Sequence, residues 1–173
     1  MTEMPRTGMP KTEMIMMERR YRAKVADLWA LWTTPAGLES WWGPPGFGVT
    51  VQQMDLRAGG ALRYVMTALA PEMVAFMKAN GMPTATPAQA TYDAVQPMTR
   101  LAYRPLVDFV PGRAAYETRM VVEFLADGDA VTMRLTFDSM HDAEWTERQR
   151  MGWELELGKL ATLLAERGLG GAL

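Results

Sequence analysis

The stretch from Glu117 to Asp138, ETRMVVEFLADGDAVTMRLTFD, predicts a β-hairpin. Two alternating runs flank Asp127-Gly128, a pair that often forms a two-residue hairpin turn. With that turn, the cross-strand pairs on one face are Phe124 with Val131, Val122 with Met133, Met120 with Leu135, and Thr118 with Phe137. That face is almost wholly apolar, whereas the opposite face carries mostly charged and hydroxyl side chains. We therefore expect one buried and one solvated side.

A long helix is predicted after the hairpin, from the cap residue Asp142 to about Arg167. Its apolar stripe, which would cover the buried face of the hairpin, consists of Trp153, Leu157, Leu160 and Leu164. Gly152 and Gly158 interrupt this helix, and each costs about 1 kcal/mol relative to Ala. Either close approach of helix and sheet or space left for a ligand would offset that cost.

The remaining chain adds strands on both sides of two short helices near the N-terminus. Strands are predicted at 13–22, 48–56, 61–67, 90–95 and 100–107, and helical turns at 25–34 and 36–41. The 69–89 insertion breaks this rhythm: a helix from Pro71 to Asn80 precedes a mobile connection. The predicted fold class is α+β, a curved antiparallel sheet whose long C-terminal helix closes an apolar cavity. Residues 1–12 are predicted to be a flexible leader, 13–167 a single domain, and 168–173 a short tail.

Composition limits the classes of partner. The chain has 173 residues, 49% of them hydrophobic, which suits one sizeable core. Its net charge of -2 comes from 18 basic and 20 acidic residues mixed along the chain, so neither nucleic acid nor a membrane surface is an expected partner. We find no signal-peptide pattern and no apolar run of membrane-spanning length, so the default location is cytoplasmic. The 16 Met residues suit an adaptable apolar surface.

Residues for catalysis or metal binding are sparse. There is no Cys, and the single His, His141, is interpreted as a solvated residue beside the helix cap. We therefore predict neither a metal nor a cofactor. The polar candidates for the interior are Tyr64, Tyr92, Tyr103, Arg104 and Glu156. A hydroxyl at the rim or a solvated charge is the favoured interpretation of each, and none is assigned a catalytic role.

The run from Trp29 to Phe47, WALWTTPAGLESWWGPPGF, resembles the activator of heat-shock protein 90 ATPase homologue family, within the START and polyketide-cyclase (SRPBCC) superfamily. DLRAGG at 55–60 and Gly152-Trp153-Glu154 extend the resemblance over nearly the whole chain. The resemblance implies a helix-grip fold with two short helices at the mouth of the cavity. The helical insertion at 69–86 departs from the family, which usually has a short Asp-Gly hairpin there.

Three functions of different classes follow. The leading hypothesis is binding of a small apolar or aromatic molecule in the cavity, with an insertion near the mouth. The alternatives are a cyclase-like or isomerase-like enzyme that uses a buried Tyr or carboxylate, and a chaperone-interacting module, by analogy alone. Either a monomer or a homodimer is compatible with the sequence. The predicted ligand-binding residues are Trp41, Tyr64, Met66, Met73, Phe76, Met77, Tyr103, Met120, Val122, Phe124, Met133, Leu135, Trp153 and Leu157.

Overall fold

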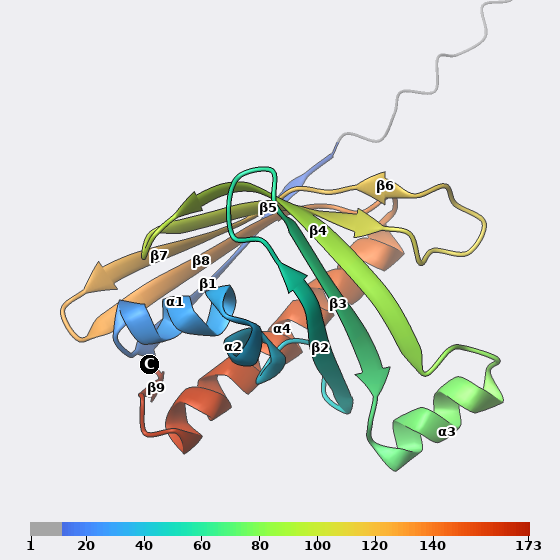
Figure 1. Cartoon of the computed structure of the whole chain (residues 1–173), viewed down its shortest axis with the longest axis horizontal. Coiled ribbons are helices and arrows are strands. Elements are labelled where there is room, and N and C mark those ends of the chain that lie inside the picture. The colour runs from blue at the N-terminus through green and yellow to red at the C-terminus, as the bar shows by residue number, and fades with distance from the viewer. Residues whose placement is uncertain (1–11) are drawn as a thin grey trace, which may run out of the picture.

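The computed structural model describes residues 12–173 and confirms the α+β helix-grip fold (Figure 1). The strands are β1 (Met14–Arg22), β2 (Phe47–Met54), β3 (Ala61–Ala68), β4 (Ala85–Gln96), β5 (Arg100–Val107), β6 (Tyr116–Glu117), β7 (Met120–Asp127), β8 (Ala130–Asp138) and β9 (Gly171–Ala172). The helices are α1 (Val25–Thr33), α2 (Pro35–Glu39), α3 (Pro71–Ala79) and α4 (Ala143–Glu166). Apart from Thr12, the predicted leader lies outside the described residues.

All the strands pair antiparallel in the order β2-β3-β4-β5-β7-β8-β1-β9, and β6 pairs with β5. Figure 1 shows the sheet curving over α4, with α1 and α2 on the same side and α3 projecting beyond the end of β3. The segment that the sequence assigns to a short tail includes β9, which extends the sheet beside β1. No helix in the described range is long and apolar enough to cross a membrane.

The β7–β8 hairpin forms with a different register from the predicted one. Phe124 pairs with Met133, and Asp127 with Ala130, so the turn is Gly128-Asp129 and each pairing moves by two residues. Gly128 has a φ of 61°, which glycine adopts without steric cost in such turns. Because side chains alternate with a period of two, a shift of two leaves the same residues on the inner face. The predicted buried face is therefore confirmed although its predicted partners are wrong.

Strand β4 begins earlier than predicted. Residues 85–89, interpreted from the sequence as a mobile connection, pair with β3, and Pro87 lies opposite Val65. The pairing of β4 with β5 starts only at Ala90, so Pro87 stands where β4 has a free edge. An edge position tolerates proline because no ladder hydrogen bond is lost there. The predicted helix before it is confirmed as α3.

Helix α4 is anchored at its start and along its apolar stripe. The Asp142 carboxylate accepts a hydrogen bond from the Trp145 amide at 2.8 Å, which confirms the predicted cap. The stripe residues Trp153, Leu157, Leu160 and Leu164 are all buried and belong to one core cluster with the inner faces of β7 and β8. This packing fixes the axis of α4 against the sheet.

Candidate functional site

A cavity of about 340 Å³ lies between the N-terminal half of α4 and the inner face of β3, β4, β5 and β7. This volume is within the range typical of small-molecule sites. Most of its wall is apolar or aromatic. The lining residues are Trp42, Pro44, Leu62, Tyr64, Met66, Ala88, Gln89, Ala90, Tyr103, Pro105, Leu106, Val107, Phe109, Thr118, Met120, Met140, Trp145, Arg148, Gln149, Gly152, Trp153 and Glu156.

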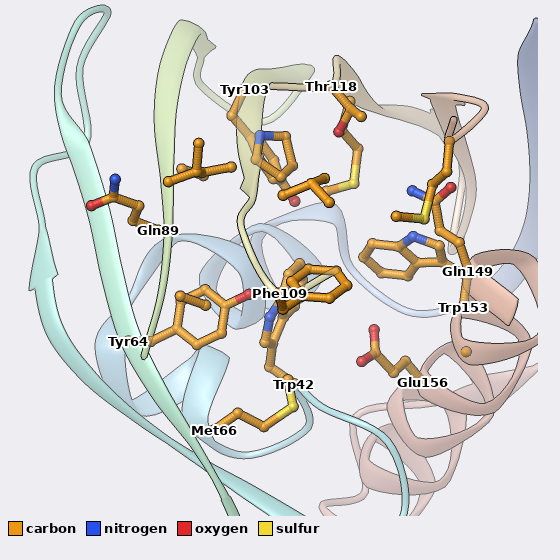
Figure 2. Close-up of a pocket in the computed structure, with 18 of the residues that line it drawn as sticks. Trp42, Tyr64, Met66, Gln89, Tyr103, Phe109, Thr118, Gln149, Trp153 and Glu156 are labelled. Atoms are coloured by element: carbon orange, nitrogen blue, oxygen red, sulfur yellow. The ribbon is translucent and has the colours of Figure 1, made fainter. Parts of the chain in front are cut away.

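Five of the residues predicted to bind a ligand line this cavity: Tyr64, Met66, Tyr103, Met120 and Trp153. They come from four separate elements, β3, β5, β7 and α4. In Figure 2, Tyr64 and Met66 lie across the cavity from Trp153. The structure therefore brings these five together around one space.

Five other predicted residues, four on the hairpin and one on α4, do not line the cavity. Val122, Phe124, Met133, Leu135 and Leu157 are at most 3% exposed and do not line the cavity. They pack into the core cluster, together with Leu160 and Leu164 from the C-terminal half of α4. We expected the cavity opposite the centre of the hairpin. It lies instead farther along the sheet, toward β3.

The residues predicted for the mouth also lie outside the cavity. Trp41 is fully buried, and its indole nitrogen donates to the Leu31 carbonyl at 2.9 Å. On α3, Met73, Phe76 and Met77 are absent from the lining, because α3 projects from the end of β3 (Figure 1). The exposed side chains of Phe109 and Arg148, with Trp145 between them, form the rim instead.

Two indoles form a rigid aromatic wall. Trp42, the neighbour of the predicted Trp41, packs edge-on against Trp153 with ring centroids 5.3 Å apart. Trp32 supports both, in a stacked contact with Trp153 at 6.3 Å and an edge contact with Trp42 at 5.4 Å. Aromatic pairs in these geometries add to the stabilisation from burial. The dense aromatic motif of the sequence thus forms part of the cavity wall.

Glu156 places a carboxyl group inside this apolar wall (Figure 2). Loss of solvation raises its pKa from 4.5 to about 7, against the opposing effects of Lys159 and of a hydrogen bond from the Gly43 backbone. Lys159 also donates to the Gly43 carbonyl at 2.8 Å, and burial lowers the pKa of its ammonium group. Near neutral pH, the protonated and the ionised forms of Glu156 are consequently both populated.

Tyrosine hydroxyls lie near this carboxyl group. Burial raises the pKa of Tyr64 to about 12, although a hydrogen bond from Trp42 acts in the opposite direction. Burial also raises the pKa of Tyr103, and the negative charge of Glu156 adds to the shift at both residues. Both hydroxyls therefore remain protonated at neutral pH and can donate hydrogen bonds. Tyr92 packs behind Tyr103 outside the cavity, and Arg104 pairs on the surface with Asp93 and Glu117.

Gly152 and Gly158 differ in their surroundings. A Cβ atom built at either position has no atom within 4 Å, so close approach of helix and sheet does not explain them. Gly152 lines the cavity, whereas Gly158 is on the exposed face of α4. Of the two explanations offered by the sequence, open space is the one that fits Gly152.

Gln149 is a functional candidate that sequence reasoning missed. It lines the cavity, and its Oε1 atom is buried without a hydrogen-bond partner among residues 12–173. A buried acceptor in this state costs about 1–3 kcal/mol. Its position four residues before Trp153 could have indicated that it faces the same way.

His141 is less solvated than predicted. Its side chain is 8% exposed, its Nδ1 atom lies 2.7 Å from the Tyr116 hydroxyl, and Nε2 lies 3.4 Å from an Asp142 oxygen. The reason is that β6 folds back over the start of α4. In the described part of the chain, no group of three or more acidic or His side chains is arranged to hold a metal ion.

The family model described as "Activator of Hsp90 ATPase homolog 1-like protein" matches residues 22–165. No curated protein matches the chain.

Several solved structures share the fold. A protein from Arthrobacter aurescens superposes with a TM-score of 0.71 at 18% identity, over 91% of this chain and 92% of that one. The AHSA1 protein from Silicibacter pomeroyi gives 0.70 at 22% identity, over 90% and 99% of the two chains. An AHSA1-like protein from Aeromonas hydrophila gives 0.68 at 20% identity, over 91% and 95%. At these identities the likeness is one of fold.

Proposed function

The chain belongs to the family of Activator of Hsp90 ATPase homolog 1-like proteins, and we propose that it binds a small molecule with a largely apolar body. The helix-grip fold supports this proposal because it can enclose a cavity between the helix and the sheet. The ligand occupies the cavity between the N-terminal half of α4 and the sheet. It stacks on Trp153 and Trp42 and contacts Met66 and Met120 on the opposite side. The ligand-binding residues proposed from the cavity therefore lie closer to β3 than those predicted from the sequence, which centre on the hairpin.

The observation that carries this proposal is the open position at Gly152. A helix interior normally avoids glycine, because glycine loses more backbone entropy than alanine on folding. Here the missing side chain leaves the cavity wall open beside Trp153, with no neighbouring atom that a methyl group would meet. Room for a ligand therefore explains why glycine occupies this position, whereas packing of the helix against the sheet does not.

A cavity-filling variant tests the proposal. Gly152→Leu fills the space, and Gly158→Leu makes the same change on the exposed face of α4. Thermal shifts and tryptophan fluorescence are measured with a panel of sterols, polyphenols and fatty acids. We expect at least one saturable ligand for the wild type and for Gly158→Leu, with binding lost in Gly152→Leu. A panel without a saturable ligand, or equal binding by both variants, would contradict the proposal.

A second candidate function is proton transfer on the bound ligand. One observation favours it: the carboxyl group of Glu156, with a pKa of about 7, lies in the same cavity as the Tyr64 hydroxyl. The carboxylate would remove a proton from the carbon beside a carbonyl group, while Tyr64 donates to the enolate oxygen. Return of the proton to another carbon would complete an isomerisation.

Exchange of that proton with solvent tests the second candidate. An enolisable cyclic enone that binds the protein is incubated in deuterated water, and loss of its α-proton signal is followed by NMR. Glu156→Gln should abolish the protein-dependent rate. Glu166→Gln, a matched change at the exposed end of α4, should leave it intact. Exchange at the rate without protein would exclude the candidate for that substrate.

A further inference from the structure

We infer that the ligand is an elongated, flat apolar molecule with a hydrogen-bond donor at each end, one received by Gln149 and the other by Glu156. This inference rests on the proposed binding function and specifies the chemistry of its ligand. The two residues lie on the same wall of the cavity as Trp153 (Figure 2).

The first end is defined by an acceptor that the protein leaves unused. Gln149 Oε1 is buried, and none of the residues from 12 to 173 donates a hydrogen bond to it. An oxygen in this state loses its hydration without compensation. A hydroxyl or amine group on the ligand would supply the missing donor. An apolar end, or a second acceptor, would leave the loss in place.

The second end is defined by a carboxyl group without a side-chain ion pair at salt-bridge distance in the described residues. Lys159, less than one turn along α4, and a hydrogen bond from the Gly43 backbone both lower the pKa of Glu156 against the effect of burial. The charge of Glu156 in turn raises the pKa of Tyr64 and of Tyr103 on the sheet. Lys159 already donates to the Gly43 carbonyl. When ionised, Glu156 is an acceptor only, so it favours a donor on the ligand.

The spacing of these two residues sets the length of the ligand. Seven positions separate Gln149 from Glu156, which is close to two turns and about 10 Å along the helix axis. Trp153 lies between them and lines the cavity as an aromatic wall, and Gly152 leaves room beside it. A rigid body of two aromatic rings spans such a distance, with one polar group at each end.

The same arrangement disfavours fatty acids. A carboxylate head would meet an acceptor at either end of this wall. Among the lining residues the cation is Arg148, whose side chain is 60% exposed and bonded to Glu144 at 2.6 Å. Its charge is therefore largely satisfied at the rim, outside the stretch between Gln149 and Glu156.

A series of three biphenyls tests the inference by calorimetric titration at pH 8, where Glu156 is mostly ionised and phenols are neutral. The first carries a hydroxyl group at the far end of each ring, the second has one hydroxyl methylated, and the third has both methylated. Each methylation removes a donor and leaves the apolar body. We expect affinity to fall about five- to tenfold at each step in the wild type.

Two variants assign the ends. In Gln149→Met the diol and the monomethyl ether should bind equally, because one end no longer distinguishes them, and both should bind better than the dimethyl ether. Glu156→Met should give the same pattern, because it removes the acceptor at the other end. The methionine side chain is apolar like the surrounding wall, so we expect the variant to fold. Equal affinity of diol and dimethyl ether for the wild type would overturn this inference alone. An unchanged ranking in both variants would also overturn it. Failure of all three compounds to bind, beside a saturable ligand from the panel of sterols, polyphenols and fatty acids, would overturn this inference and leave the proposed function standing.

Discussion

Glu156 makes the stability of the fold depend on pH near neutrality. Its pKa is about 7 in the folded chain and 4.5 when solvated, so the folded state holds more protons between these values. Stability therefore falls as pH rises from about 4.5 through 7, by on the order of 3 kcal/mol. Glu156→Gln should lose this dependence and gain stability at pH 8. Urea unfolding at pH 5 and pH 8 measures it, and a variant whose stability changes in parallel with the wild type would contradict it.

Gly152 and Gly158 form a second pair of predictions at the residue scale. Alanine at either position should raise the free energy of unfolding by about 1 kcal/mol, because neither methyl group meets an atom within 4 Å. Only Gly152→Ala places its methyl group in the cavity and so reduces the space for a ligand. Thermal unfolding with and without a ligand should therefore show equal stabilisation but weaker binding by Gly152→Ala alone. Weaker binding by both variants would point to an effect of helix rigidity instead.

Among the elements, β6 contacts the segment just before α4 through Tyr116, whose hydroxyl lies 2.7 Å from Nδ1 of His141 and whose ring packs edge-on against the imidazole. Tyr116→Phe removes that hydrogen bond, at a cost of about 1 kcal/mol. Amide exchange in 108–119, which carries Phe109 at the rim, should become faster, while exchange in β7 and β8 stays unchanged. Tyr92→Phe is the control, because the Tyr92 hydroxyl has no partner among the described residues. Equal exchange in both variants would mean that β6 is held by its pairing with β5.

The two halves of α4 differ in their packing over the whole molecule. Leu160 is fully buried in the core cluster, so Leu160→Ala should cost about 2–5 kcal/mol. Met66→Ala, on the opposite side of the cavity, should cost about 1 kcal/mol or less, because its side chain already faces an open space. Equilibrium unfolding of the two variants provides the comparison. A large cost at Met66 would indicate that the cavity collapses around it.

The sequence predicts the scaffold better than the cavity. The alternation in 117–138 and the stripe of α4 determine the faces, and these survive even the shift of two in the hairpin register. Trp41 and Trp42 are adjacent in one short motif, and nothing in the pattern shows which indole reaches the cavity. Gln149 lies one helical turn before Trp153, so periodicity could have placed it on the same face, whereas Phe109 comes from a connection and reaches the rim through tertiary position, which periodicity does not encode. The cavity forms where α4 and the sheet move apart, and the sequence pattern does not show where along α4 this happens.

One consequence of the division of α4 concerns evolution. The residues that hold the helix to the sheet follow Trp153, while those that face the hollow precede it or share its turn. Substitutions at 149, 152 and 156 can accordingly accumulate with little penalty to folding. Descendants of one ancestor could exchange their ligands while inheriting the same architecture, and selection could tune molecular recognition and foldability as nearly separate traits.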